Sequence, residues 1–229
     1  MNMEKIKRYI RNHEQFMYIL SFIYRWVSGN RVIGRRNLDM QCRGAFFRKS
    51  RIENRGKNNQ LILEKGCRIC KLKVRFFGDN NCVVIHRDCV LDNVDIWISD
   101  GSTIEVGHNT HFTGDTHIAS IEGKTVHIGE RCLLAEQIIF RTGDSHSVLN
   151  DCGERINPAE DIWIGDHVWI GQQVTVLKGV HIGDECVIGT RAVVTGKQFG
   201  NGELLVGMPA RAVKQNITWN HRNLSVKDK

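Results

Sequence analysis

An aliphatic residue returns at every sixth position through residues 164–194, which read IGDHVWIGQQVTVLKGVHIGDECVIGTRAVV. An α-helix places apolar residues three and four apart and a half-buried strand places them two apart, so neither explains a period of six. Smaller residues recur four positions after each member of this series. The two series are Ile164, Ile170, Val176, Ile182, Ile188 and Val194, and then Val168, Val174, Val180, Cys186 and Ala192. One large and one small inward position per six residues predict short strands joined by tight corners. Three such units close one turn of a parallel β-helix, with every eighteenth residue stacked on its predecessor.

Weaker coils precede this stretch, beginning near Leu61. They start at Leu63, Ile85, Val106 and Ile128, so the spacing is 22, 21 and 22 residues. We expect the extra residues to bulge at corners such as GDNN and ISDGST, where Gly, Asn, Asp and Ser favour turns. The sequence predicts an all-β chain with four parts: a basic helical segment over 1–35, a lead-in over 36–60, the β-helix over 61–200 and a tail over 201–229.

The six-residue period breaks in RTGDSHSVLNDCGERINPAED and resumes at Ile164. Ile128 and Ile164 are 36 residues apart, which equals two full turns. A loop over residues 147–161 is therefore expected to leave the stack without disturbing it. Functional residues concentrate on loops that a rigid scaffold holds in place.

The net charge of +7 is concentrated at the start of the chain. Residues 1–57 hold 14 Lys and Arg against 4 Asp and Glu, whereas residues 58–229 hold 18 against 21. The apolar stretch FMYILSFIYRWV is shorter than the roughly 20 residues that span a bilayer, and Arg25 interrupts it. Residues 1–30 are expected to pack on the first coil or a neighbouring subunit, with a peripheral contact to a membrane as the alternative. No nucleic acid is expected as a partner.

Four of the eight cysteines fall in the small inward positions, namely Cys67, Cys89, Cys132 and Cys186. Packing of buried thiols explains them. The pair Cys67 and Cys70 has C-x-x-C spacing but no second pair for zinc, so no metal is expected. Because no cleavable signal peptide is recognisable, we expect a cytoplasmic protein, with attachment at the inner face of the cell membrane as the variant that residues 1–30 allow.

Several motifs resemble those of the hexapeptide-repeat acyltransferases with a left-handed β-helix, in particular the sugar and polysaccharide O-acetyltransferases. The resemblance covers residues 61 to about 215 and is densest in RTGDSHSV, GERINP, DIWIGDHVWIGQQVTVLKGVHIGDECVIG and VGMPARAVK. It implies left-handed winding, a homotrimer, and transfer of an acetyl group from acetyl-CoA to a carbohydrate hydroxyl. A capsular or lipopolysaccharide sugar, or its precursor, is the expected acceptor.

The resemblance assigns the catalytic histidine of these enzymes to His146. An imidazole can take the proton of a sugar hydroxyl as it attacks a thioester, and return it to the leaving thiolate. Asp144 is a candidate for supporting that imidazole, with turn formation in Thr142-Gly143-Asp144 as the equal alternative. Trp169 matches the tryptophan that lies beside the thioester, and its flanking residues are inward, so its own side chain is expected to point outward.

Coenzyme A is expected in the groove between neighbouring β-helices. The resemblance carries the cofactor-binding role to six residues: Trp169, Gly171, Gly189, Thr190, Lys197 and Arg211. The chain departs from the family pattern at Arg191, where glycine is common, and in TGKQFGNGELL, which lacks the usual prolines.

Two other functions fit a β-helix. A γ-class carbonic anhydrase would need three zinc-binding histidines on adjacent coils, and His108, His111 and His117 are the nearest approach to that pattern. A scaffold or sugar-binding module without catalytic activity is the second alternative. Retention of His146, Trp169 and the loop favours the enzyme over both.

Overall fold

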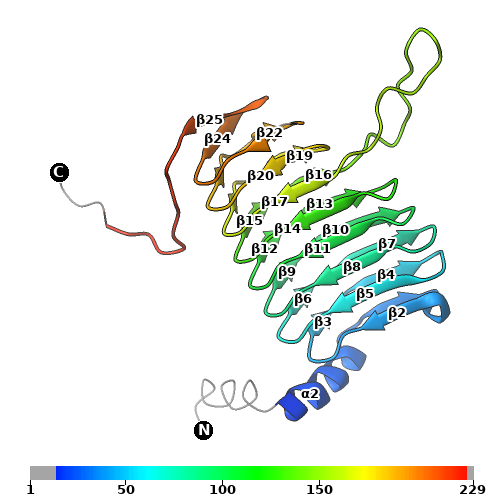
Figure 1. The fold of residues 1–229 in the computed structure, drawn as a ribbon. Coiled ribbons are helices and arrows are strands. Elements are labelled where there is room, and N and C mark those ends of the chain that lie inside the picture. Colours follow the sequence, from blue (N-terminus) through cyan, green and yellow to red (C-terminus); the bar gives the residue numbers. More distant parts are fainter. Residues whose placement is uncertain (1–13, 197, 226–229) are drawn as a thin grey trace.

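The computed structural model of the chain describes residues 14–196 and 198–225. Within them one α-helix, α2 (Glu14–Val27), precedes a stack of short strands wound into a three-sided solenoid (Figure 1). The expected all-β class, with an N-terminal helix and parallel coils, is confirmed. From β1 to β24, successive strands go in turn to three sheets, here called A, B and C, and each strand pairs with the strand one turn away. The last strand, β25, joins sheet C beside β24.

The strand bounds follow this threefold order. Sheet A consists of β1 (Arg31–Ile33), β4 (Arg51–Asn54), β7 (Lys73–Phe77), β10 (Val94–Ser99), β13 (Thr116–Ser120), β16 (Ile139–Arg141), β19 (Thr175–Leu177) and β22 (Val193–Val194). Sheet B consists of β2 (Leu38–Gln41), β5 (Asn59–Leu63), β8 (Cys82–Ile85), β11 (Thr103–Val106), β14 (Thr125–Ile128), β17 (Ile162–Ile164), β20 (His181–Ile182) and β23 (Gln198–Phe199). Sheet C consists of β3 (Phe46–Arg48), β6 (Arg68–Cys70), β9 (Val90–Asp92), β12 (His111–Gly114), β15 (Leu133–Glu136), β18 (Trp169–Ile170), β21 (Val187–Ile188), β24 (Leu204–Gly207) and β25 (Ala210–Lys214).

Both six-residue series fill the core, as the sequence predicts. Every member of the two series between residues 164 and 194 is buried, and Ile164 pairs in register with Ile182 on the next turn. The four cysteines of the small positions are also buried. Burial raises the pKa of the Cys132 thiol to about 12, which fits packing rather than reactivity.

The solenoid begins well before the expected Leu61. Arg31 already pairs with Arg51 one turn later, so a complete turn precedes the predicted start, and a second turn, from Arg51 to Lys73, has already begun there. Residues 36–60 are thus coils of the solenoid and not a lead-in, and a 3-10 helix over Arg35–Asn37 overlaps their start. The helix ends at Val27 and does not reach residue 35. Residues 1–13 lie outside the described part of the chain.

One face of α2 packs on the first coil. Met17 and Ser21 are buried there, and the Ser21 hydroxyl accepts a hydrogen bond of 3.2 Å from the Gly44 amide. The opposite face exposes apolar side chains to solvent, namely Phe16, Ile19, Phe22, Ile23, Trp26 and Val27. In the described residues no helix has the length and apolar character needed to span a bilayer.

The extra residues of the longer turns lie at the corner between sheets A and B. Gly78–Asn81 and Asp100–Ser102 form two of these corners, as expected for GDNN and ISDGST. Buried amides satisfy the widened corner internally: the Asn59 side-chain oxygen accepts from the Asn81 backbone amide, and the Asn81 side-chain oxygen accepts from the Ser102 amide. This A–B corner is therefore where the scaffold tolerates insertions.

The chain ends by turning back over sheet C. Strand β25 pairs antiparallel with β24, and the segment after it returns along the outside of β18. There the Trp219 indole donates a hydrogen bond of 2.6 Å to the His167 carbonyl and stacks on the His167 ring at 4.4 Å. The tail over 201–229 is thus part of the folded unit as far as residue 225.

Candidate functional site

A single long loop leaves the solenoid between β16 and β17, at the A–B corner (Figure 1). It comprises residues 142–161, so it begins before the expected residue 147. Val126 pairs with Ile162 beyond the loop, so the stack continues past it in register. Ile128 pairs directly with Ile164, so these residues are one turn apart, and the 36-residue spacing is a single turn that contains the loop. The expected two full turns are therefore wrong, although the stack does resume in register after the loop.

Buried groups hold the base of the loop. The Thr142 hydroxyl accepts a hydrogen bond of 3.0 Å from the Ile121 amide, and the Thr142 carbonyl accepts one from Glu160 at 2.9 Å. Gly143 is required for close packing, because a Cβ there would lie 2.7 Å from the Ile121 side chain and 3.2 Å from Ala159. The two ends of the loop are therefore fixed against the preceding turn.

The His146 imidazole is exposed near this base, and its backbone is held by Asn157. The buried Asn157 amide donates hydrogen bonds of 2.8 Å to the His146 carbonyl and to Asp144 Oδ2. Its side-chain oxygen accepts from the Val148 amide at 2.7 Å. In residues 14–196 and 198–225 the imidazole itself forms no hydrogen bond or ion pair, so it is free to contact an incoming group. Sequence reasoning missed Asn157, although GERINP contains it.

Asp144 lies beside Lys178 and not beside the imidazole. Lys178 Nζ is 2.6 Å from Asp144 Oδ2, and this ion pair together with the Asn157 hydrogen bond lowers the pKa of Asp144. In the described chain no hydrogen bond joins Asp144 to His146. The geometry of one chain thus gives Asp144 the role of fastening the loop to the following turn.

A second ion pair anchors the other strand of the loop. Arg155 Nη2 lies 2.7 Å from Glu122 Oε1, and Glu122 also accepts a hydrogen bond from the Ala159 amide. The Arg155 guanidinium, and with a smaller effect the Ala159 hydrogen bond, lowers the pKa of Glu122, and desolvation only partly opposes this shift. The loop is therefore tied to both the turn before it and the turn after it.

The outer half of the loop is a narrow hairpin with an apolar surface. Leu149 and Arg155 form an antiparallel bridge, and the Asn150 side chain accepts hydrogen bonds from two amides at the tip. Val148, Leu149 and Ile156 are more than half exposed. Three exposed aliphatic side chains on one short hairpin are typical of a surface that another chain covers.

The candidate cofactor residues gather on sheet C and its corner with sheet A. Trp169 points outward from β18, as predicted, is 41% exposed and lies 6.1 Å from the Trp219 ring. Gly171, Gly189 and Thr190 follow at the C–A corner, and Arg211 lies on β25 at the end of the same sheet. Lys197 lies outside the described residues. Trp169 thus already has an aromatic neighbour in its own chain.

The two corner glycines are needed by the stack itself. A Cβ on Gly171 would lie 2.8 Å from the Ile188 carbonyl and the Thr190 amide, and a Cβ on Gly189 would lie 2.9 Å from Val206. Close approach of successive turns is therefore sufficient to require glycine at both positions.

The catalytic candidates lie on different sides of one chain. His146 and Asp144 belong to the A–B corner, whereas Trp169 projects from sheet C, the third side of the prism. The structure thus brings the cofactor candidates together and separates them from His146.

Three histidines considered as zinc ligands occupy different surfaces. His108 pairs with Glu130 at 2.7 Å, His111 lies on sheet C near His221, and His117 lies on sheet A. Within the described residues no group of three or more His, Cys, Asp or Glu side chains is arranged to hold a metal ion. The arrangement needed for a γ-class carbonic anhydrase is not formed by these three.

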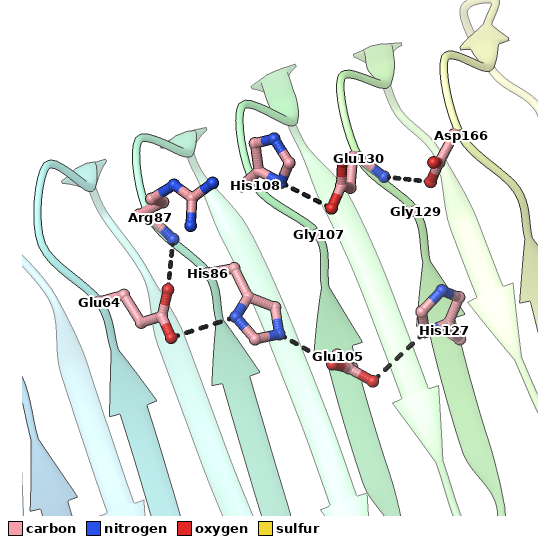
Figure 2. A pocket seen from close by; sticks show the side chains of 10 residues that line it. All are labelled: Glu64, His86, Arg87, Glu105, Gly107, His108, His127, Gly129, Glu130 and Asp166. Carbon is pink, nitrogen blue, oxygen red and sulfur yellow. Dashed lines mark hydrogen bonds and ion pairs between the residues drawn. The ribbon is translucent and has the colours of Figure 1, made fainter.

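The other histidines of this region form a polar ladder along sheet B (Figure 2). His86 lies between Glu64 and Glu105, at 3.2 and 2.8 Å, and Glu105 also reaches His127 at 3.3 Å. Burial lowers the pKa of His86, but the hydrogen bonds to Glu105 and Glu64 outweigh it and the net shift is upward. The His127 ring stacks on Trp163 at 3.8 Å. This ladder lines a pocket of about 340 Å³ and links four successive turns.

Comparison with known proteins matches both the repeat and the whole architecture. The family described as bacterial transferase hexapeptide (six repeats) matches residues 161–196. The chain is 32% identical over 168 residues to the polysialic acid O-acetyltransferase of Neisseria meningitidis, which covers 73% of this chain and 78% of the relative. It is 34% identical over 122 residues to the galactoside O-acetyltransferase of Escherichia coli K12, covering 52% of this chain and 58% of the relative.

Solved structures agree over most of the chain. The crystal structure of a polysialic acid-specific acetyltransferase is 31% identical, with a TM-score of 0.75 over 86% of this chain and 87% of that chain. The crystal structure of a polysialic acid O-acetyltransferase is 27% identical, with a TM-score of 0.80 over 86% of this chain and 94% of that chain.

The solenoid of six-residue repeats fits a known class of acyltransferases, and similarity of this extent places the chain within it. The chain belongs to the hexapeptide-repeat acyltransferases, in the branch of the sugar and polysaccharide O-acetyltransferases. It is thus an enzyme of carbohydrate O-acetylation.

Proposed function

We propose that the chain acetylates a hydroxyl of a surface polysaccharide, capsular or lipopolysaccharide, or of its precursor, with His146 as the general base. The observation that carries the proposal is the pair of hydrogen bonds that the Asn157 side chain forms with the His146 carbonyl and the Val148 amide. They hold the backbone of His146, whose imidazole is exposed at the mouth of the loop. The names of the relatives, which include polysialic acid O-acetyltransferases, support the acceptor class.

In the proposed reaction the imidazole removes the proton of the acceptor hydroxyl as its oxygen attacks the thioester carbonyl. The C–S bond then breaks, and the imidazolium returns the proton to the coenzyme thiolate. In this proposal acetyl-CoA lies against Trp169, Gly171, Gly189 and Thr190, with Arg211 toward its phosphates. His146→Ala is expected to lower turnover by about 10² to 10⁴-fold while acetyl-CoA affinity and melting temperature stay unchanged. Wild-type turnover in that variant would overturn the mechanism.

A homotrimer completes this site, because His146 and Trp169 lie on different sides of one chain. In the proposed assembly the loop of one subunit reaches sheet C of its neighbour, and repetition of that contact closes a ring. The exposed loop residues Val148, Leu149 and Ile156 are then covered by the neighbour. The donor and the base thus come from two subunits.

Mixed assemblies test the shared site. When His146→Ala and Trp169→Ala chains are refolded together in equal amounts, about one site in four combines an intact His146 with an intact neighbouring Trp169. Activity should therefore rise above that of either variant alone. Activity that stays at the level of the two separate variants, or a fully active monomer in light scattering, would contradict the shared site.

Residues 1–30 are proposed to hold the enzyme at the inner face of the cell membrane. The exposed apolar face of α2, which includes Phe22 and Trp26, and the basic residues that precede it in the sequence suit an anionic lipid surface. Each Lys or Arg near such a surface contributes about 1 kcal/mol, so binding should weaken with salt. The proposal fails if a chain lacking residues 1–30 binds phosphatidylserine vesicles as well as the full chain.

A further inference from the structure

The outward side chains of sheet A form a basic surface that the proposed reaction does not use. The strands of sheet A carry five Lys and Arg against two acidic residues, whereas the strands of sheet B carry two acidic residues and no Lys or Arg. The cations are Arg31, Arg51, Lys73, Arg75 and Arg141. Arg31, Arg51 and Lys73 stand in one row, since each pairs in register with the next. Inward residues alternate with them, so the charged row faces solvent.

An exposed aromatic platform lies in the middle of this surface. The rings of Phe77 and Trp97 stack at 4.3 Å and an angle of 21°, and Trp97 is 39% exposed. The guanidinium of Arg75 lies 5.2 Å from the Trp97 ring, and that of Arg55 lies 5.0 Å from the Phe77 ring. The platform therefore offers a flat apolar surface bordered by cations. Such a surface can pack against a sugar ring while the cations meet its carboxylate.

Further cations lie beyond both ends of the platform, with the uncharged outward Ala119 between Trp97 and Arg141. Toward the start of the chain it opens into a pocket of about 640 Å³ lined by Arg35, Arg36, Arg55 and Lys57, with Asp79 as the one acidic residue of the lining. Asp79 Oδ1 accepts a hydrogen bond of 2.7 Å from the Lys57 backbone amide. Toward the loop the surface ends at Arg141, whose guanidinium donates to the Ser145 hydroxyl next to His146.

The surface has the length of several sugar units. Strands β4, β7, β10, β13 and β16 follow one another toward the loop (Figure 1), and four strand spacings amount to about 19 Å. The two acidic residues of the surface, Glu53 and Asp95, are each paired with arginine at Arg51 and Arg75 respectively. The net charge along the path stays positive.

We infer that the outward face of sheet A binds an extended acidic polysaccharide and leads it to His146. This inference rests on the proposed function for the reaction, and names the acceptor as a polymer that carries carboxylates. Its cations hold the carboxylates over several units, and Trp97 packs against one ring between them. A single sugar would reach only the loop and gain none of these contacts, so affinity should rise with chain length.

Binding measured without acetyl-CoA tests the surface separately from catalysis. Isothermal titration of the full chain with polysialic acid, and with the same polymer after reduction of its carboxylates, gives the two affinities. Trp97→Ala should weaken binding of the acidic polymer roughly tenfold, the range for truncation of an aromatic anchor. The double variant Arg51→Gln with Lys73→Gln should weaken it as well and reduce its dependence on salt.

The matched control removes two exposed cations from another side, with Arg68→Gln and Arg87→Gln on sheet C and at the B–C corner. This control and His146→Ala should bind the acidic polymer as the wild type does, and the reduced polymer should bind weakly to all of these proteins.

The inference is overturned if the control loses as much affinity as the sheet A variant, if both polymers bind equally, or if polysialic acid does not bind at low salt. A smaller assembly for Trp97→Ala in light scattering would also overturn it, since the face would then join copies of the chain. Failure of His146→Ala to lose turnover would refute the proposed base and leave these affinities unaffected.

Discussion

Asn157→Ala should disable the enzyme while leaving its fold intact. The Asn157 amide spans the base of the loop, donating to the His146 carbonyl and to Asp144, and accepting from Val148 and, at 3.3 Å, from Arg155. It touches neither the donor nor the acceptor in the proposed reaction. Its role is to position the histidine, and the substitution removes all four hydrogen bonds together.

The size of the effect follows from these contacts. Each internal hydrogen bond contributes about 1 kcal/mol net, and groups left unpaired in a buried place add to the loss, so loop closure should weaken by about 2 to 4 kcal/mol. The ion pairs of Arg155 with Glu122 and of Lys178 with Asp144 remain. We therefore expect a fall in kcat of about 10- to 100-fold, near the lower end of what that free energy corresponds to.

Asn150→Ala is a matched control within the same loop. Asn150 is also an asparagine whose side chain accepts from two amides, those of Cys152 and Glu154, and donates to Glu154 at 2.9 Å. It lies at the tip and not beside His146. Kinetics with acetyl-CoA and a carbohydrate acceptor should show a loss of kcat for Asn157→Ala only, with the KM for acetyl-CoA unchanged in both.

Global stability provides the second readout. The loop lies outside the stacked turns, so the melting temperature of Asn157→Ala should fall by less than about 2 to 4 °C, the value for 1 kcal/mol in a domain of this size. Hydrogen exchange at the Val148 amide should accelerate, since its acceptor is removed. Wild-type kcat in Asn157→Ala, or an equal loss in Asn150→Ala, would refute the positioning role.

Three further outcomes are expected. Trp169→Ala should weaken acetyl-CoA binding and lower turnover by roughly tenfold, because it removes an aromatic wall; unchanged acetyl-CoA affinity would exclude it from the donor site. His86→Gln should destabilise the protein mainly below the ordinary histidine pKa: the raised pKa of His86 means that its stabilisation is present below the unfolded value and is lost as pH rises through the folded one. The melting temperatures of wild type and variant should therefore differ at pH 6 and converge by about pH 8.5. A difference in melting temperature that stays constant with pH would contradict a stabilising role for the charged His86 ring. Thiol labelling of the native protein should modify the exposed Cys152 first and reach Cys89, Cys132 and Cys186 only on unfolding; rapid labelling of these core thiols would show that the inward positions are accessible.

The regular half of the solenoid could be predicted from sequence because its turns obey one period. Between Ile164 and Val194 the turns are equal in length, so inward positions repeat without interruption. The first turns escape detection for a physical reason. They are longer and unequal because the A–B corner is widened, and inward residues such as Leu38 and Ile52 therefore recur at irregular intervals.

The site divides in the same way. His146 and Trp169 stand in motifs that sequence alone can identify, and the outward direction of Trp169 follows from its inward neighbours. The ion-pair partners of the loop residues cannot be predicted from the sequence. Asp144 pairs with Lys178, 34 residues away, and Arg155 pairs with Glu122, 33 residues away. Only the stacking of turns brings such distant positions together. For the same reason the basic row of sheet A is invisible in the sequence, where a whole turn of the solenoid separates each member from the next.

The two ends of the solenoid limit how long an assembly of these molecules can grow. Parallel coils present open hydrogen-bonding edges at both ends, and identical open edges invite molecules to join end to end into fibres. In this chain α2 packs beside β3 at one end, and β25 runs antiparallel along β24 at the other. A reversed strand cannot act as the next turn of an incoming parallel coil. Deleting residues 210–225 would therefore convert a discrete enzyme into one prone to grow along its own axis.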